Sequence, residues 1–175
     1  MTILETERLA LRPYTQDDFD ALYEILSDPE TMKHYPKPYD AKGTQRWLDW
    51  NFANYRDCGF GLWAVVLKET GEFIGDCGIT MQSINGQTLP EIGYHIHKAH
   101  WRKGYASEAA RCCMAYAFDT LGFPAVYSYM TDSNAASYGV ALKNGMKLVE
   151  TYEDAAHVKH RVYAITLQEW NDKYE

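Results

Sequence analysis

The sequence is poor in the residues that mark secreted, metal-binding and membrane-spanning proteins. Its four cysteines, Cys58, Cys77, Cys112 and Cys113, show no C-x-x-C spacing, and no N-x-S/T sequon occurs. Neither a zinc knuckle nor a disulfide framework is therefore predicted. No apolar run is long enough to span a bilayer, and residues 1–12 lack the basic start and apolar core of a signal peptide. We expect a cytoplasmic protein with reduced thiols and no membrane partner.

Positive charge is also scarce. Lys and Arg number 17 against 24 Asp and Glu, which gives a net charge of -7. Because binding to phosphate backbones needs clustered Lys and Arg, nucleic acid is not expected as a partner. Hydrophobic residues make up 46% of the 175 residues, as in ordinary globular proteins, and this length suits a single domain, residues 1–175.

The spacing of apolar residues predicts a mixture of strands and helices, and hence an α+β protein with a largely antiparallel sheet. The segment 28–40 contains three prolines and is expected to be irregular. Strands are predicted at 3–12, 62–67, 73–80, 89–97, 126–131, 146–152 and 158–167. Helices are predicted after Thr15 and at 42–56, 104–121 and 134–143.

The most informative segment runs from His95 to Ala109, where a predicted strand passes through a basic turn into a helix. Backbone N–H groups at a helix N-terminus point outward, and the helix dipole favours negative charge there. Gly104 lets a phosphate approach the main chain, while Arg102 and Lys103 add positive charge. The segment therefore predicts an anion site.

This turn resembles the acetyl-CoA signature Q/R-x-x-G-x-G/A of the GNAT superfamily of N-acetyltransferases. Gly104 and Ala106 fill its fourth and sixth places, and Trp101 stands where Gln or Arg is expected. The resemblance to the ribosomal-protein-alanine N-acetyltransferase branch covers nearly the whole chain. It extends to residues 5–13, 91–94, 134–137 and 143–146.

The resemblance implies a GNAT fold: a mixed, mostly antiparallel sheet of about seven strands flanked by about four helices. Its fourth and fifth strands, 89–97 and 126–131, should splay apart and admit the pantetheine arm of acetyl-CoA. Acetyl-CoA would be the acetyl donor, an amine the acceptor, and no metal is implied. A homodimer that pairs through terminal strands or helices is compatible with this resemblance.

The resemblance also assigns cofactor contacts. The backbone of Ile96 should bind the pantetheine, the turn before the long helix should wrap the pyrophosphate, and Asn134 should contact the cofactor arm. The expected cofactor-binding residues are Ile96, Trp101, Arg102, Lys103, Gly104, Tyr105, Ala106, Ser107 and Asn134.

Acetyl transfer needs a neutral amine, because an ammonium group has no lone pair. Glu91, at the start of the splayed strand, is the carboxylate predicted to take the proton, although an exposed strand Glu would look the same. Many superfamily members protonate the leaving thiolate with a Tyr, and Ala141 stands at that position here. Ser137 is the nearest matching hydroxyl, as acid or as cofactor ligand, with Tyr138 one residue away. The missing Tyr leaves a non-catalytic acyl-CoA sensor as an alternative.

Other patterns suggest weaker hypotheses. Glu91, His95 and His97 share a predicted strand face, and His100 follows, which suggests zinc or a polar pocket lining with proton carriers near neutrality. Residues 59–64 match the dinucleotide fingerprint G-x-G-x-x-A, but they precede a strand instead of opening a helix.

The remaining histidines and several aromatic residues complete the candidates. His157 and His160 are expected at the surface. By the resemblance, five aromatic residues fall on the acceptor side of the cleft, although core packing explains aromatic residues equally well. They are Tyr35, Tyr39, Trp47, Trp50 and Phe60.

Overall fold

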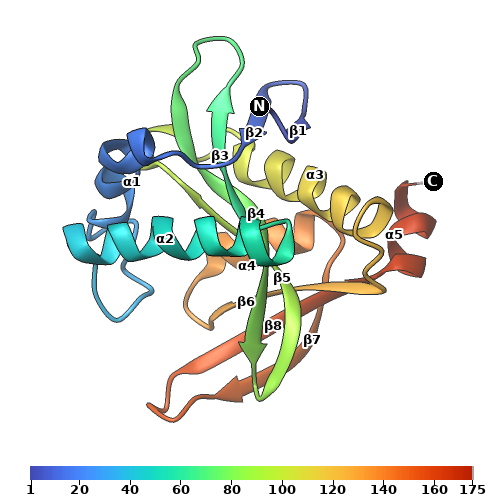
Figure 1. Cartoon of the computed structure of the whole chain (residues 1–175). Coiled ribbons are helices and arrows are strands. Elements are labelled where there is room, and N and C mark those ends of the chain that lie inside the picture. The colour runs from blue at the N-terminus through green and yellow to red at the C-terminus, as the bar shows by residue number, and fades with distance from the viewer. Residues whose placement is uncertain (175) are drawn as a thin grey trace.

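The computed structural model describes residues 1–174 and contains one eight-stranded sheet (Figure 1). The strand order across the sheet is β1-β2-β3-β4-β5-β6-β8-β7. The strands are β1 (Leu4–Glu5), β2 (Leu9–Arg12), β3 (Leu62–Leu67), β4 (Phe73–Ile84), β5 (Gln87–Ile96), β6 (Ala125–Thr131), β7 (Lys147–Glu153) and β8 (Lys159–Thr166). The helices are α1 (Phe19–Leu26), α2 (Ala41–Cys58), α3 (Tyr105–Asp119), α4 (Ala135–Lys143) and α5 (Leu167–Tyr174), with short 3-10 turns η1 (Gln16–Asp18) and η2 (Lys98–His100).

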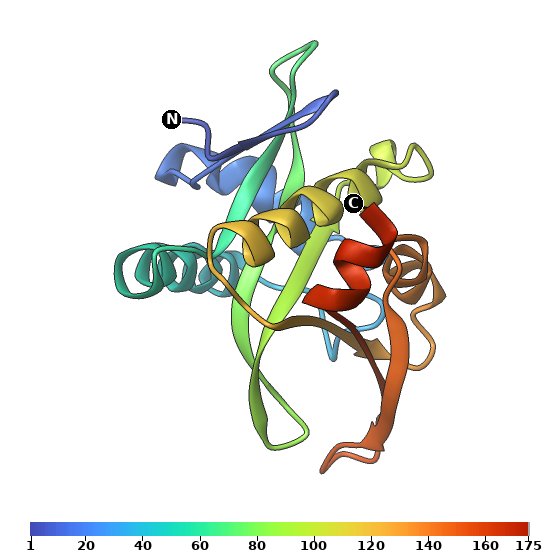
Figure 2. The same cartoon turned by 90° about the vertical axis from the view of Figure 1, so that its right-hand side faces the viewer.

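Helices cover both faces of the sheet and create two apolar cores. On one face α1 and α2 bury Leu22, Ile25 and Leu48 against the sheet. On the other face α3, with α4 and α5, buries a larger core that includes Cys113 and Trp170. Figure 2 shows α2 and α3 on opposite sides of the strands. Residues of β5 that alternate along the strand therefore face two different environments.

The sheet is antiparallel except where β5 meets β6. These two strands run parallel and are paired at a single position, Glu91 with Tyr127. The Ser128 hydroxyl adds a hydrogen bond of 2.9 Å to the Ile92 carbonyl. Elsewhere β6 pairs with β8 along its whole length, and β5 with β4. The expected α+β architecture, a mixed and mostly antiparallel sheet flanked by helices, is confirmed.

Several predicted boundaries were wrong. The single strand expected at 3–12 is a tight hairpin of β1 and β2, because Thr6 N–H donates to the Leu9 carbonyl at 2.9 Å and turns the chain. This hairpin raises the strand number from about seven to eight. The helix expected after Thr15 begins as the 3-10 turn η1. Helix α5 was missed, and it is anchored by Trp170.

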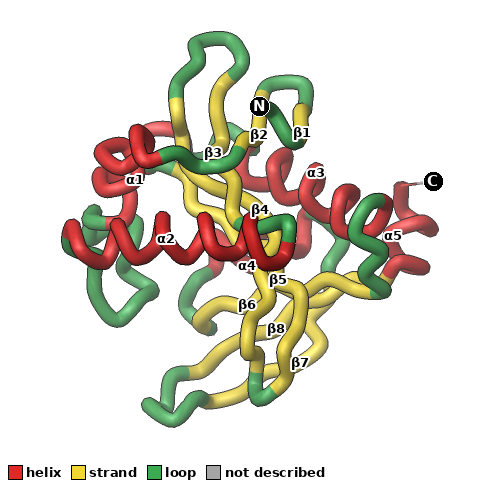
Figure 3. Tube along the Cα trace, viewed as in Figure 1, coloured by secondary structure: helices red, strands yellow, loops and turns green. Residues whose placement is uncertain are grey.

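The structure bears on other features of the sequence as well. Segment 28–40 contains no helix or strand, as its prolines predict (Figure 3). All four cysteines are free, and the sulfurs of buried Cys77 and Cys113 lie 3.7 Å apart. No helix within residues 1–174 has the length and apolar character needed to cross a membrane.

Gly78 of β4 is in register with Leu62, the first residue of β3, and therefore lies beside Gly61. The Gly61 carbonyl accepts a hydrogen bond from Ile79 N–H, and a Cβ on Gly78 would lie 2.0 Å from that oxygen. We expect Gly78→Ala to lower the free energy of unfolding by about 3 kcal/mol, because the contact is with backbone that cannot move aside. Urea denaturation measures this change.

Gly139 of α4 provides the matched control, since a Cβ there meets no atom within 4 Å. Gly139→Ala should raise the free energy of unfolding by about 0.5–1 kcal/mol through the unfolded state. If both variants were equally stable, the close packing over Gly78 would be contradicted.

Candidate active site

The turn between β5 and α3 has the backbone geometry of an anion site. Arg102 and Gly104 adopt positive φ angles of 62° and 82°, and Gly104 is the residue before the first turn of α3. The first N–H groups of a helix have no intrahelical acceptor. In α3 these belong to Tyr105, Ala106 and Ser107, which continue the turn. The predicted anion-binding residues are therefore contiguous at one helix end, where the dipole favours negative charge.

Two cations that the motif analysis did not include converge on Gly104. A Cβ on Gly104 would lie 3.4 Å from Arg8 Nη2 and 3.9 Å from Lys143 Nζ. Arg8 is oriented by Glu108 at 2.6 Å and by the Lys103 carbonyl at 2.9 Å. Both cations lie in the segments that resemble the family, 5–13 and 143–146, and this was the available signal for them. They increase the positive potential at the turn although the whole chain is acidic.

Trp101 replaces the expected polar side chain, and its indole folds back onto β5. The Nε1–H of Trp101 donates to the Ile96 carbonyl at 2.6 Å. A carbonyl oxygen has a second lone pair, so Ile96 retains an acceptor at the end of β5. The side chain that departs from the motif therefore ties the turn to the end of β5.

Glu91 lies where β5 and β6 meet, and its side chain is partly buried. The carboxylate leans along the strand, since Oε1 lies 3.2 Å from the position of a Cβ on Gly93. Withdrawal from water raises the pKa of Glu91 well above its usual value, and a hydrogen bond from the Tyr129 backbone opposes this rise. A carboxylate with a raised pKa is a stronger base.

Ser137 and Asn134 lie at the start of α4. The Asn134 side chain caps the helix by accepting the Ser137 N–H at 3.2 Å. The Tyr94 hydroxyl donates to the Ser137 carbonyl at 2.8 Å and lies 3.2 Å from Ser137 Oγ. Tyr138 points away from them, with its ring against Tyr163 and under the Arg161 guanidinium. The hydroxyl beside Ser137 is thus Tyr94, which sequence reasoning missed.

On the α2 side of the sheet, His95 and Asp76 form a polar network. His95 Nδ1 lies 3.0 Å from Asp76 Oδ1, and His95 Nε2 lies 2.8 Å from the Tyr35 hydroxyl. Asp76 is fully buried, and its other oxygen accepts from the Tyr14 hydroxyl at 2.7 Å and the Trp47 indole at 3.1 Å. Sequence analysis placed His95 in a polar pocket but did not predict the Asp76 partner.

The other aromatic residues of the acceptor-side prediction fall into two groups. The Trp47 ring packs on those of Tyr39 and Trp50 beside His95. Phe60 instead lies in the core of the opposite face, against Phe123.

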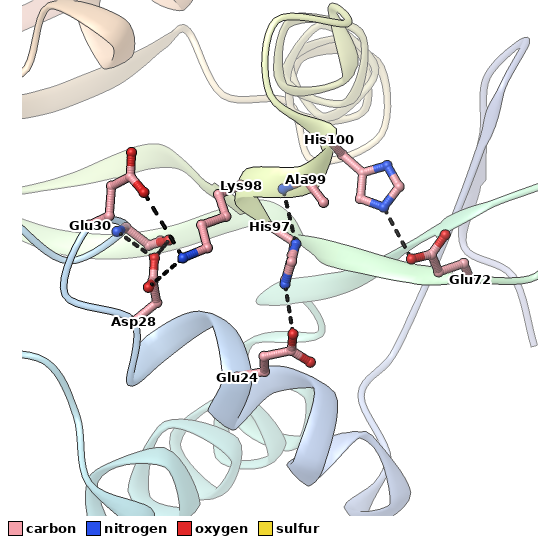
Figure 4. Close-up of polar contacts among 9 residues, drawn as sticks. Glu24, Asp28, Glu30, Glu72, His97, Lys98, Ala99 and His100 are labelled. Carbon is pink, nitrogen blue, oxygen red and sulfur yellow. Dashed lines mark hydrogen bonds and ion pairs between the residues drawn. The ribbon is translucent and has the colours of Figure 1, made fainter.

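The histidines proposed as zinc ligands do not converge. His97 pairs with Glu24 at 3.0 Å and His100 with Glu72 at 3.1 Å, in different directions (Figure 4). Within residues 1–174 no three His, Cys, Asp or Glu side chains are grouped to hold a metal ion. The strand face shared by Glu91 and His95 is therefore lined by acid–base groups held by separate partners.

Ion pairs fasten the irregular segment 28–40 to the end of β5. Lys98 lies 3.0 Å from Asp28 and 3.9 Å from Glu30 (Figure 4). Hydrogen bonds from Thr31, and then the one from Lys98, lower the pKa of Asp28 to about 2. The connection holds the segment that contains Tyr35 beside the strand that contains His95.

The remaining sequence hypotheses are settled by chain order and exposure. Residues 59–61 join the end of α2 to β3, which is a helix-to-strand connection opposite to that of a dinucleotide site. His157 is exposed as expected, whereas His160 is partly buried and pairs with Asp154 at 2.9 Å.

Comparison with known proteins places this geometry in a family. Residues 8–147 match the family model described as acetyltransferase (GNAT) domain. YkkB of Bacillus subtilis (strain 168) is 37% identical over 171 residues, which cover 97% of this chain and 91% of YkkB. The N-acetyltransferase p20 of Bacillus licheniformis is 31% identical over 95% of this chain and 96% of its own. FsC-acetyl coenzyme A-N(2)-transacetylase of Aspergillus fumigatus is 30% identical over 95% of this chain and 77% of its own.

Solved structures agree with the sequence matches. An acetyltransferase from Agrobacterium tumefaciens str. C58 is 33% identical, with a TM-score of 0.81 over 93% of this chain and 92% of that one. The RimL ribosomal L7/L12 alpha-N-protein acetyltransferase, solved with coenzyme A, is 17% identical with a TM-score of 0.78 over 97% and 99% of the two chains. At that identity the likeness concerns the fold.

The cations around Gly104 should affect acetyl-CoA binding through its phosphates alone. Lys143→Gln should weaken binding about five- to tenfold at low salt, which corresponds to about 1 kcal/mol, and Arg8→Gln should weaken it at least as much. Isothermal titration calorimetry measures both affinities.

Two controls isolate the phosphate contribution. Arg56→Gln removes an exposed cation paired with Asp57 and should leave the affinity unchanged. S-acetylpantetheine, which lacks the pyrophosphate, should bind Lys143→Gln and the unsubstituted protein equally. Equal loss for both ligands would contradict a phosphate role for Lys143.

Proposed function

The chain belongs to the GNAT acetyltransferase family and is an acetyl-CoA-dependent N-acetyltransferase, and we propose that it moves the acetyl group to a primary amine by direct attack in a ternary complex. The acceptor is a protein N-terminal α-amine or the amine of a small molecule. Glu91 carries this proposal, because a carboxylate with a raised pKa lies where β5 and β6 separate. The N-transacetylase activity in the name of the Aspergillus relative also supports a nitrogen acceptor.

The donor end of the site follows from the turn before α3. Backbone N–H groups from Arg102 to Ser107 bind the pyrophosphate, with Arg8 and Lys143 balancing its charge. The opening between β5 and β6 admits the pantetheine beside Ile96. Asn134 and Ser137 lie across this opening, where β6 leads into α4. These assignments place the thioester near the single paired position of the two strands.

The chemistry then needs three groups. Glu91 takes a proton from the acceptor ammonium, and the free nitrogen attacks the thioester carbonyl. A C–N bond forms, the C–S bond breaks, and coenzyme A leaves as a thiolate. Ser137, with Tyr94 at its hydroxyl, passes its proton to the thiolate, and one of the protons lost by the acceptor nitrogen restores the Ser137 hydroxyl. No cysteine forms a covalent intermediate in this scheme, so both substrates must be bound together.

Removal of the Glu91 charge should separate catalysis from binding. Glu91→Gln should lower kcat about 100-fold or more, with unchanged affinity for acetyl-CoA, because the variant loses the base but keeps the phosphate site. The assay follows release of the coenzyme A thiol with panels of N-terminal peptides, polyamines and aminoglycosides as acceptors.

Initial velocities at varied concentrations of both substrates test direct attack. Intersecting double-reciprocal lines are expected, and parallel lines would contradict a ternary complex. An unchanged kcat in Glu91→Gln would remove Glu91 from the reaction.

The raised pKa also makes a prediction about stability. Burial penalises the charged form of Glu91, so its effect on folding is most favourable at low pH and worsens as pH rises from the unfolded-state pKa, about 4.3, through the raised folded-state value. Glu91→Gln should therefore raise the Tm at pH 7 by about 2–4 °C, equivalent to about 1 kcal/mol.

The higher Tm of Glu91→Gln should disappear below about pH 4, where Glu91 is protonated in the folded and the unfolded states. Calorimetric scans at the two pH values measure it. Glu69→Gln is the control, because Glu69 is exposed in the turn between β3 and β4 and should show no difference. If Glu91→Gln had a lower Tm than the unsubstituted protein at pH 7, an unfavourable burial of the charged Glu91 would be contradicted.

A further inference from the structure

Acetylation of an ammonium group removes two protons from one nitrogen. The first must leave before attack, because the lone pair is needed, and the second leaves as the attached nitrogen becomes a neutral amide. One of these protons balances the departing thiolate, and the other is released. Glu91 is still protonated when the second proton leaves the nitrogen, and Ser137 lies beside Tyr94 on the other face of β5. A second acceptor on the Glu91 side would therefore take this proton from the nitrogen before it is passed on.

We propose that Tyr35 and His95, backed by the buried carboxylate of Asp76, form this second proton-accepting site. The proposal rests on the proposed function, since it concerns the same acetyl transfer. His95 and Glu91 lie on the same face of β5 with Gly93 between them. No side chain at Gly93 separates the two groups, and the Glu91 carboxylate leans over that position.

The proposal assigns the proton of His95 to Nδ1. A carboxylate at Asp76 only accepts, so in this assignment Nδ1–H donates to Asp76 Oδ1, which lies 3.0 Å away. Nε2 of His95 then has a free lone pair and accepts from the Tyr35 hydroxyl at 2.8 Å. This is the tautomer that an imidazole needs in order to act as a base.

When His95 accepts a proton it becomes an imidazolium cation, and Asp76 is the group that pairs with this cation. The side chain is fully buried, and its donors are the hydroxyl of Tyr14, the indole of Trp47 and His95. None of these donors carries a permanent positive charge. A buried carboxylate is more stable beside a cation than beside neutral donors alone. A proton that arrives on His95 Nε2 creates that cation beside Asp76.

Tyr35 connects the network to the site. Tyr35 as a residue is 40% exposed, whereas the side chain of His95 is 8% exposed, so the network meets the surface at Tyr35. Withdrawal of its hydroxyl from water, and then the charge of Glu91, raise the pKa of Tyr35 and keep it protonated. The hydroxyl oxygen takes a proton from the acceptor nitrogen as its own proton passes to His95 Nε2. The proton count is conserved, and no other reactant is needed.

Several groups influence the charge on His95. They are Asp76 from β4, Tyr35 from segment 28–40, the Trp47 indole from α2, Glu91 from the same strand, and Tyr14 through Asp76. The first step of the test is spectroscopic and needs no acceptor. At neutral pH, ¹⁵N NMR should show His95 protonated on Nδ1 alone, and Asp76→Asn should remove this preference. A proton resident on Nε2 instead of Nδ1 would overturn the proposal.

The kinetic test compares His95→Gln and Tyr35→Phe with the unsubstituted protein, using the best amine of the acceptor panel. At saturating substrates, His95→Gln should lower kcat about 100-fold and change the shape of the kcat–pH profile. Tyr35→Phe should lower kcat at least tenfold. His157→Asn, at an exposed position with a positive φ angle that Asn tolerates, should behave like the unsubstituted protein.

Unchanged affinity for acetyl-CoA confirms that each variant is folded, and Tyr35→Phe tests the relay at a position where only a hydroxyl is lost. If His95→Gln and Tyr35→Phe keep the kcat and the pH profile of an active parent, the network is structural and the proposal fails while the proposed function stands. If the unsubstituted protein acetylates no amine, the proposed function itself fails, before any variant is compared.

Discussion

The arrangement of this protein depends on the way β5 and β6 separate after a single paired position. Glu91 and Tyr127 are in register, and the Ser128 hydroxyl ties the strands once more through the Ile92 carbonyl. Beyond that point each strand keeps its other neighbour, so the sheet stays intact while its centre opens. The opening exposes backbone polar groups that a continuous sheet would have paired, and these groups favour an extended, hydrogen-bonding ligand such as a pantetheine arm.

The same separation brings three kinds of chemistry together. The end of β5 leads into the turn before α3, where Arg102 and Gly104 have positive φ angles and Arg8 and Lys143 supply charge. One face of β5 presents Glu91 toward the α2 side, and the other presents Tyr94 toward Ser137 on α4. Because successive side chains of a strand point to opposite faces, one short strand can carry groups for both ends of the reaction.

Asp76 connects several elements on the α2 side of the sheet. It joins Tyr14 after β2, Trp47 of α2 and His95 of β5 at one buried carboxylate. Lys98 and Asp28 hold the irregular segment with Tyr35 against the same region. The cost of burying Asp76 is offset by three donors, and loss of any one donor would leave a charged group poorly satisfied.

The sequence predicted the elements whose patterns are local. The apolar stripe of α3 gave nearly correct boundaries, and the Asn85-Gly86 turn lies between β4 and β5 as predicted, although β4 runs to Ile84. The turn that resembles the GNAT signature leads into α3 as expected. The hairpin of β1 and β2 was missed because its turn is held by Thr6 and Arg8 contacts to Glu108, about 100 residues away. The contacts of Asp76 and Tyr35 with His95 were missed for the same reason, since only the folded sheet brings these side chains together. Helix α5 depends on packing of Trp170 against Phe118, which no local pattern shows.

The most direct measurement of the central claim is a crystal structure of the protein with acetyl-CoA. The account predicts the pyrophosphate on the backbone N–H groups from Arg102 to Ser107, the pantetheine between β5 and β6, and the thioester on the side of the opening that Glu91 borders. A cofactor bound elsewhere, or β5 and β6 paired along their length in the complex, would contradict it.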